Sequence, residues 1–169
     1  KDYLTGLGFS VRLLPGKVNP AVFAQLKPET RNLSTVLIYG HYDVQPPGAP
    51  SAWTTPAFEP NIRKGRIYAR GATDNKGQLT IHLSAVKNLI EQFGVDHLPL
   101  NIKFYIEGEE EIGSPGVSRH LSLYPELFSS DYIILSDTEM VSPGYPSLDV
   151  SLRGVMDLQV SLQTGSHDV

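Results

Sequence analysis

Four short acidic or histidine-containing segments carry residue types that bind metal ions. They are His41-Tyr42-Asp43, Asp74-Asn75, Glu109-Glu110-Glu111 and Asp137. Each follows a stretch whose composition predicts a β-strand, and open α/β sheets bind ligands at the carboxyl ends of their strands. We therefore expect the four segments to meet at one edge of a sheet. So many carboxylates in one place would repel one another, and a pair of hard divalent cations removes that repulsion.

Each segment also has a plain structural interpretation. Asp74 could be a helix N-cap, and the glutamate run could be a solvated surface. His41 differs from an ordinary strand-end histidine, because Asp43 lies two residues on and can share its side of an extended chain. That carboxylate can bind one imidazole nitrogen while the other faces a metal. The other four histidines lack such neighbours, and we expect them to be structural: His82, His97, His120 and His167.

The elements that would position these segments alternate between strands and helices. Apolar or alternating stretches predict strands at residues 9–14, 21–26, 35–40, 66–69, 100–106 and 132–135. Apolar residues at helical spacing predict a helix over 76–93, with Asp74 or Asn75 as N-cap and Gly94 as its stop. A shorter helix is expected at 115–123. Residues 41–65 contain five prolines and predict a long loop. This order predicts an α/β fold with a mostly parallel mixed sheet and helices on both faces.

The pattern changes after Pro143-Gly144. Residues 148–152 and 155–162 predict two strands with no helix between them, and the second alternates polar and apolar side chains. This change predicts a boundary near Arg153-Gly154.

Composition narrows the class of protein. The 169 residues are 40% apolar and 19% charged, which excludes a disordered tail and a coiled coil. A net charge of −4 argues against a surface for nucleic acid or anionic membrane, and no apolar run approaches the ~20 residues of a membrane span.

There is no cysteine, so any metal needs His, Asp and Glu ligands, and a reducing cytoplasm fits. The chain begins without Met and stops after a strand-like stretch, so we expect a fragment of a longer protein.

Four motifs resemble those of the di-zinc exopeptidase family, which contains carnosinases, dipeptidases, glutamate carboxypeptidase, and acetylornithine and succinyl-diaminopimelate deacylases. The motifs are GHYDVQP at 40–46, RGATDNKG at 70–77, EGEEEIGS at 107–114 and Ser136-Asp137. Their order and spacing are similar to the family's across residues 33–154. The residues of the first motif resemble those of the carnosinase and dipeptidase branch most.

The resemblance implies a role for each site residue. His41 resembles a ligand of one zinc, with Asp43 as the carboxylate that orients it. Asp74 resembles the carboxylate that bridges both zincs, and Asp137 the remaining ligand of the zinc that His41 binds. In relatives the peptide bond after the bridging aspartate is cis, so Asp74–Asn75 is expected to be cis. Asn75 replaces an aspartate that is common in relatives.

The family's adjacent glutamate pair is followed by one residue and then Gly-Ser. Here that pair is Glu110-Glu111, because Ile112 precedes Gly113-Ser114. Glu110 then resembles the general base and Glu111 the ligand of the second zinc. A register shifted by one residue, with Glu109 as base and Glu110 as ligand, stays open.

The activity implied by the resemblance is metal-dependent hydrolysis of the amide bond of dipeptides or short peptides. A Zn²⁺ pair would activate a water, and Glu110 would take its proton and pass it to the leaving amine. Mn²⁺ and Co²⁺ also suit these ligands. Two alternatives stay open: a deacylase of N-acyl amino acids from the same family, and a catalytically inert metal-binding or interaction domain.

The resemblance also implies a domain division. Residues 1–152 correspond to the N-terminal part of a catalytic metallopeptidase domain, and residues 153–169 to the start of a lid domain through which relatives commonly form homodimers. In relatives a lid histidine and the last zinc-ligand histidine follow the equivalent of Val169, so we expect the isolated chain to be inactive. The expected partner is a small peptide substrate, with no nucleic acid or membrane.

Overall fold

The computed structural model describes residues 1–26 and 32–165. The chain divides into two compact units, Lys1–Asp137 and Thr138–Val169. All the candidate site residues lie in the first unit.

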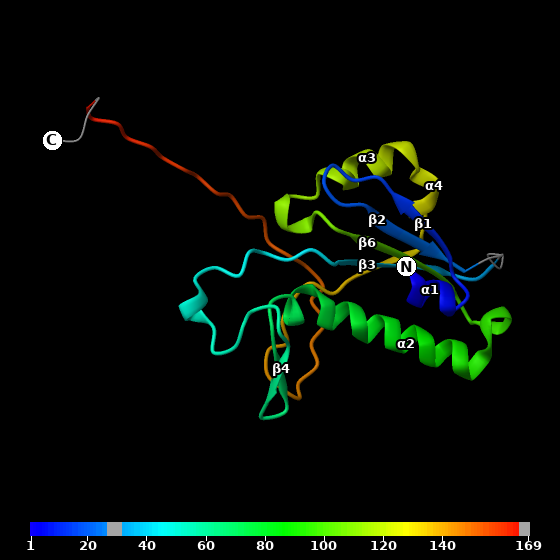
Figure 1. Cartoon of the computed structure of the whole chain (residues 1–169). Coiled ribbons are helices and arrows are strands. Elements are labelled where there is room, and N and C mark those ends of the chain that lie inside the picture. The colour runs from blue at the N-terminus through cyan, green and yellow to red at the C-terminus, as the bar shows by residue number, and fades with distance from the viewer. Residues whose placement is uncertain (27–31, 166–169) are drawn as a thin grey trace. The chain divides into compact units, whose positions relative to one another are not determined.

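The first unit is built on a five-stranded sheet with the order β1-β2-β6-β3-β7 (Figure 1). Its strands are β1 (Ser10–Leu14), β2 (Ala21–Gln25), β3 (Thr35–His41), β6 (Asn101–Glu107) and β7 (Tyr132–Leu135). β2 pairs antiparallel with β1 and β6, whereas β3 pairs parallel with β6 and β7. Thus β1, β6, β3 and β7 run in one direction and β2 runs in the other. The predicted mostly parallel mixed sheet is confirmed.

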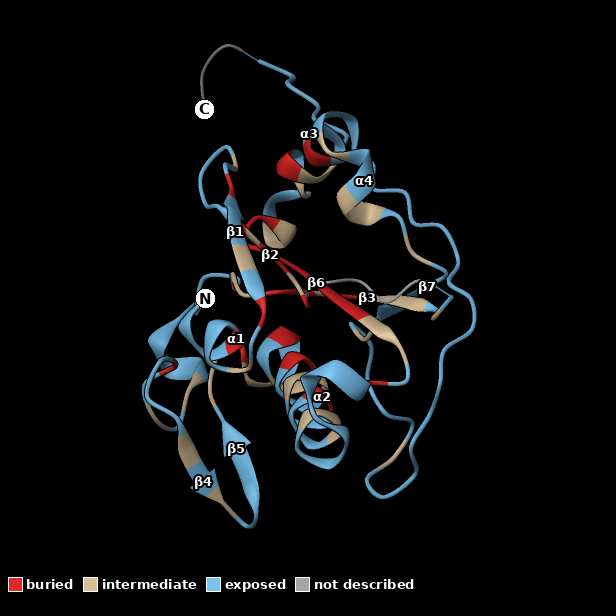
Figure 2. Ribbon diagram, turned by 90° about the vertical axis from the view of Figure 1, so that its right-hand side faces the viewer, coloured by how far each residue is buried: buried red, intermediate tan, exposed pale blue. Residues whose placement is uncertain are grey.

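Helices cover both faces of this sheet (Figure 2). The α-helices are α1 (Asp2–Gly6), α2 (Gly77–Phe93), α3 (Pro115–Leu123) and α4 (Pro125–Phe128). On one face Leu79 and Val86 of α2 belong to the same buried cluster as Phe104 of β6. On the other face Val117 of α3 packs against a cluster that contains Tyr105. Neighbouring side chains of a strand point to opposite faces, so β6 contributes to both cores. No described helix has the length and apolar content needed to cross a membrane.

Helix α2 ends as predicted but begins differently. Gly94 has a φ of +75° and donates its N–H to the carbonyl of Ile90 at 2.8 Å, which stops the helix. The helix begins at Gly77, and neither Asp74 nor Asn75 caps it. The predicted N-cap is wrong because both side chains bond instead to residues at the end of the sheet.

A β-hairpin occupies the last part of the predicted 41–65 loop. Its strands are β4 (Asn61–Arg63) and β5 (Arg66–Tyr68), which pair antiparallel. The turn residues Lys64 and Gly65 have φ values of +50° and +73°. Positive φ at both central residues is the geometry that matches a two-residue hairpin turn to the strand twist. The prediction of a loop was therefore wrong for residues 61–63, because lysine is an uncommon residue in that turn.

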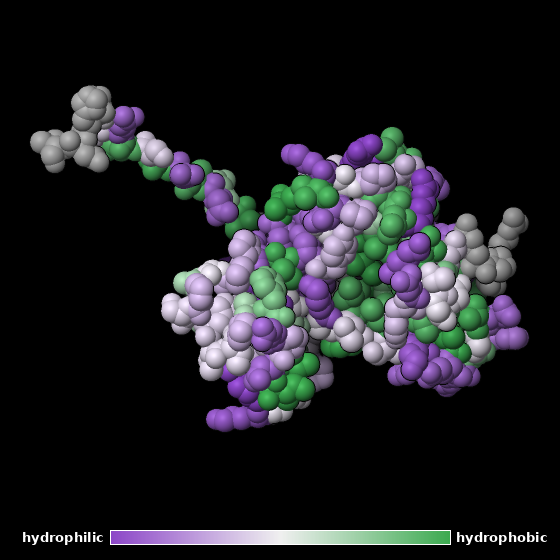
Figure 3. Space-filling model, in the orientation of Figure 1, coloured by the Kyte–Doolittle hydropathy of each residue, from purple (hydrophilic) through white to green (hydrophobic). Residues whose placement is uncertain are grey.

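The second unit contains neither of the two strands predicted for it. The segments 148–152 and 155–162 have no strand partner among the described residues, and their apolar side chains are exposed (Figure 3). Val155, for example, is 92% exposed. An alternating pattern forms a strand only where a second strand accepts its hydrogen bonds. Ser142 and Tyr145 form one bridge around Pro143-Gly144. The domain boundary between residues 152 and 153 stays a prediction.

Candidate functional site

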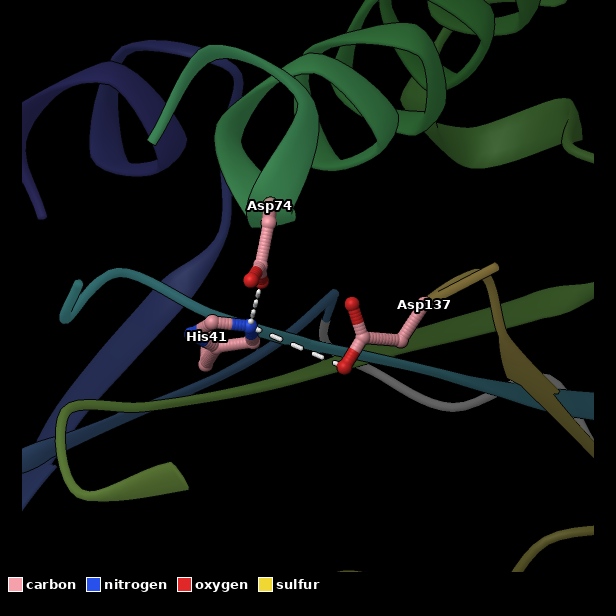
Figure 4. Close-up of side chains that lie close together, drawn as sticks. All are labelled: His41, Asp74 and Asp137. Atoms are coloured by element: carbon pink, nitrogen blue, oxygen red, sulfur yellow. Dashed lines mark hydrogen bonds and ion pairs between the residues drawn. The ribbon is translucent and has the colours of Figure 1, made fainter. Parts of the chain in front are cut away.

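The strand order places the ends of β3, β6 and β7 side by side at one edge of the sheet. His41 is the last residue of β3, and Asp137 lies two residues beyond β7. Asp74 comes from the helical turn η2 (Ala72–Lys76) directly before α2. In the close-up view the side chains of His41, Asp74 and Asp137 point toward one another from these three elements (Figure 4).

The three side chains form a compact group of metal-ligand type. Nε2 of His41 lies 2.9 Å from Oδ1 of Asp74 and 3.6 Å from Oδ2 of Asp137. One ligand atom from each residue lies within 4.8 Å of the others. His41 is fully buried, whereas the Asp74 and Asp137 side chains are 57% and 32% exposed. The His41 end of the group is therefore buried, and the side formed by Asp74 and Asp137 is open to solvent.

Asp43 lies behind His41, as the sequence predicted. Its Oδ1 is 3.3 Å from Nδ1 of His41, and its backbone carbonyl is 3.1 Å from the same nitrogen. The carboxylate also accepts the backbone N–H groups of Glu110 at 3.3 Å and Glu111 at 3.0 Å. Asp43 thus joins the imidazole to the acidic turn that follows β6.

The Glu109 side chain has partners outside this group. Its side chain is buried and accepts the backbone N–H groups of Val18 and of Asn19, the latter at 3.1 Å. Burial alone would raise the pKa of the Glu109 carboxyl, but these backbone hydrogen bonds outweigh burial and lower it. The carboxylate of Glu109 therefore holds the backbone of the loop between β1 and β2.

Glu110 lies at the start of the turn η4 (Glu110–Ile112), which follows β6. Burial raises the pKa of its carboxyl, and the nearby carboxylates, Asp137 foremost, raise it further, while His41 acts against them. The Glu110 carboxyl therefore interacts electrostatically with His41 and Asp137.

Glu111 lies on the same turn as Glu110, and its side chain is bound by Gln45. Its carboxylate accepts the backbone N–H of Gln45 at 3.1 Å and the Nε2 amide of the same residue at 2.7 Å. Glu111 is not among the three residues whose ligand atoms lie within 4.8 Å of one another. The structure thus brings three of the four predicted metal ligands together and places the fourth on the adjoining turn.

Negative charge dominates the environment of His41. Its burial favours the neutral imidazole, yet surrounding carboxylates, with Asp137 the strongest, raise the pKa of His41 above its ordinary value. Carboxylates that raise the pKa of a buried imidazole in this way also favour a bound cation. The electrostatics thus agree with the predicted metal site.

Two positioning contacts were not predicted from the sequence. Asn75 is buried and donates its side-chain N–H to Oδ1 of Asp137 at 2.9 Å, and Gln45 binds Glu111 as described. Both residues belong to the sequence motifs that contain the candidate site residues. That position in the motifs was the signal that could have identified them. The Asp74–Asn75 peptide bond is cis, as predicted.

The described histidines outside the group have structural contacts or lie at the surface. Nε2 of His82 lies 2.7 Å from Oγ of Ser136, and Nδ1 of His120 lies 2.9 Å from the Tyr105 hydroxyl. His97 is exposed. His167 lies outside the described residues.

Comparison with known proteins adds an independent line of evidence. The model of Peptidase family M20/M25/M40 matches residues 37–153. The chain is 36% identical over 162 residues to a cysteinylglycine-S-conjugate dipeptidase from Corynebacterium striatum, covering 95% of this chain and 35% of that protein.

Two solved structures share the fold. Human carnosine dipeptidase 1 superposes with a TM-score of 0.74 and 35% identity, covering 83% of this chain and 32% of that one. An M20 family metallo-carboxypeptidase from Sulfolobus solfataricus gives a TM-score of 0.71 and 38% identity, covering 79% and 30%. The chain thus spans about a third of the length of these relatives.

Proposed function

The chain belongs to Peptidase family M20/M25/M40, and from that membership we propose that it supplies part of the active site of a metal-dependent dipeptidase. The observation that carries this proposal is the group formed by His41, Asp74 and Asp137 at the carboxyl edge of the sheet. Similar proteins are named as dipeptidases acting on cysteinylglycine conjugates and on beta-Ala-His. The proposed substrates are accordingly dipeptides or short peptides.

The residues present fit a divalent metal. One imidazole nitrogen and two carboxylate oxygens within 4.8 Å of one another form a donor set of the kind that Zn²⁺, Mn²⁺ and Co²⁺ accept. The surplus negative charge around His41 supports a cation at this position. We propose zinc as the native metal, with His41, Asp74 and Asp137 holding one ion and Asp74 and Glu111 contributing to a second. When bound, such ions supply Lewis acidity that polarises an amide carbonyl and makes water easier to deprotonate.

The chain's own residues account for the proton movements in this proposal. The Glu110 carboxylate accepts a proton from the water that attacks the amide carbon. The same carboxyl then gives that proton to the leaving nitrogen as the carbon–nitrogen bond breaks, which restores the base. Asp43 holds Nδ1 of His41, so that Nε2 points toward Asp74 and Asp137.

The contacts of the glutamate run support Glu110 rather than Glu109 as the base. The Glu109 carboxylate already accepts the backbone N–H of Asn19. The pKa of Glu110, in contrast, is lowered by His41 and raised by Asp137, which supports a carboxyl near both. A register shifted by one residue would require Glu109 to abandon its buried hydrogen bonds.

The family resemblance supports a further proposal about the whole protein. Residues 153–169 would begin a lid domain through which two copies associate, and light scattering of the intact protein tests that association. The absence of cysteine fits a cytoplasmic location.

Substrate turnover with and without metal tests the proposed function. The intact protein that contains this chain would be stripped with a chelator, reloaded with Zn²⁺, Mn²⁺ or Co²⁺, and assayed on dipeptides and on N-acyl amino acids. We expect dipeptide hydrolysis that disappears with the metal and returns with it. His41→Ala should abolish this hydrolysis, whereas His97→Ala, at an exposed histidine, should not.

The other outcomes decide between the alternatives. Turnover of N-acyl amino acids alone would make the protein a deacylase. Metal binding without turnover of either class would make it an inert metal-binding domain.

A further inference from the structure

The side chain of Asn75 lies between two members of the metal-binding group and contacts both. Its Oδ1 accepts the backbone N–H of His41 at 3.3 Å. Its Nδ2 donates to Oδ1 of Asp137 at 2.9 Å and to the backbone carbonyl of Ser136 at 3.0 Å. Asn75 is 2% exposed, and its contact with His41 is buried, whereas the contacts with Ser136 and Asp137 are partly buried. One amide thus joins the end of β3, the turn before α2 and the segment after β7.

The partners of Asn75 match an amide group. His41 offers an N–H donor, whereas Ser136 and Asp137 offer oxygen acceptors. A side-chain amide carries one carbonyl oxygen and an NH₂ group with two hydrogens, so it satisfies all three partners at once. A buried polar network whose members are all satisfied is rigid and holds one arrangement.

The hydrogen bond to Asp137 determines which of its oxygens faces the group. Asn75 binds Oδ1, and this leaves Oδ2 at 3.6 Å from Nε2 of His41. Rotation of the Asp137 carboxylate would leave the buried Asn75 amide without this acceptor, which is costly. The amide therefore aims one carboxylate oxygen toward the position that a metal would occupy.

The backbone around Asn75 leaves room for this arrangement. A Cβ atom added to Gly40 would lie 3.0 Å from Oδ1 of Asn75 and 3.3 Å from Cδ1 of Leu79. Any larger residue at position 40 would therefore press on the amide or on the core beside it. The glycine before His41 allows Asn75 to approach the strand.

We infer that Asn75 is a positioning residue that fixes the backbone of His41 and the direction of the Asp137 carboxylate before a metal binds. The inference rests on the proposed function, because it needs a metal at this group. Residues that orient metal ligands in this manner typically contribute about 10–100-fold to metal affinity. Asn75 itself contributes no ligand atom.

Metal affinity and coordination geometry test this role. Asn75→Leu removes all three hydrogen bonds while keeping the branched shape and the number of heavy atoms of the side chain. Asn75→Ala removes them without overpacking if the larger leucine prevents folding. The matched control is Asn101→Leu. Asn101 bonds to the Leu33 carbonyl at 3.1 Å and to Oγ1 of Thr35 at 3.3 Å, at the start of β6 and the opposite end of the sheet.

In the intact protein, Zn²⁺ affinity would be measured by competition with a chromophoric chelator, coordination by the visible spectrum of the Co²⁺ form, and stability by urea unfolding without metal. We expect both Asn75 variants to bind Zn²⁺ about 10–100-fold more weakly and to change the Co²⁺ spectrum. Asn101→Leu should lower stability yet keep the wild-type affinity and spectrum.

Two results would overturn the role of Asn75 while leaving the proposed function intact. One is a folded Asn75 variant with wild-type affinity and spectrum. The other is an equal loss of affinity in Asn101→Leu, which would show that general stability is responsible. A wild-type protein that binds neither Zn²⁺ nor Co²⁺ would overturn the proposed function and this inference with it.

Discussion

Oδ1 of Asp43 lies 3.3 Å from Nδ1 of His41, the ring nitrogen that does not face Asp74. This contact favours a proton on Nδ1 and leaves the Nε2 lone pair for a metal. The same carboxylate accepts the backbone N–H of Glu111 at 3.0 Å, so one side chain sets both the imidazole and the acidic turn.

Removal of this carboxylate should weaken metal binding. We expect Asp43→Ala to lower Zn²⁺ affinity by about 10–100-fold, measured by chelator competition. The control is Asp131→Ala, because Oδ2 of Asp131 accepts the backbone N–H of Thr35 at 2.7 Å at the other end of β3. Equal affinities in the two variants would show that Asp43 does not orient His41.

Glu109 is expected to matter for stability. Glu109→Gln replaces a buried charged acceptor of backbone N–H groups with a neutral amide, and we expect a loss of about 1–3 kcal/mol in the free energy of unfolding. Urea denaturation measures it. Glu91→Gln, which breaks an exposed pair with Lys87, should cost no more than about 0.5 kcal/mol. A Glu109→Gln variant as stable as Glu91→Gln would contradict the structural role.

Metal binding should stabilise the folded protein. A ligand at 100 times its dissociation constant adds about 2.7 kcal/mol to the free energy of unfolding, so chelation should lower the melting temperature. Asp137→Asn should lose most of this difference, whereas Asp96→Asn, at an exposed position, should keep it. Differential scanning calorimetry with and without chelator measures both. Identical melting curves in the wild type would argue against a metal at this edge.

The strand ends that carry the candidate site could be predicted from the sequence, because the residue patterns that indicate these strands are local. An unbroken apolar run precedes His41, and the predicted strand 132–135 and helix 115–123 agree with β7 and α3 to the residue. The carboxyl ends of parallel strands lie at the same end of a sheet, so the sequence predicted that His41 and Asp137 converge. The strand order that makes β3 and β7 neighbours comes from the structure. The family resemblance was confirmed by the comparisons.

The contacts that hold the site depend on long-range packing and could not be predicted. Glu109 and Asn19 are 90 residues apart, and no periodic pattern connects them. The amide of Asn75 reaches Asp137 only because the turn before α2 lies over the end of β7. The hairpin at Lys64-Gly65 was missed because its turn uses an uncommon residue. The alternating pattern of 155–162 indicated a strand but not whether a partner strand exists.

Replacement of Glu111 should change the metal content of the protein more directly than it changes the proton transfer. We expect Glu111→Gln to lose one of the two proposed metal ions, because a neutral amide is a poorer ligand than a carboxylate. Elemental analysis of the purified intact protein measures the stoichiometry. Loss of metal from Glu110→Gln with full retention in Glu111→Gln would instead assign the ligand to Glu110 and the base to Glu109.

We propose that Glu110 moves the proton at a metal-dependent hydrolytic site, and turnover of Glu110→Gln measures this role. The variant keeps the volume of the side chain and loses the basic oxygen. Dipeptide hydrolysis and metal content would be measured on the same sample of the intact protein. We expect a loss of turnover of about 10²–10⁴-fold with both metals retained. Turnover close to that of the wild type in a metal-loaded Glu110→Gln protein would contradict it.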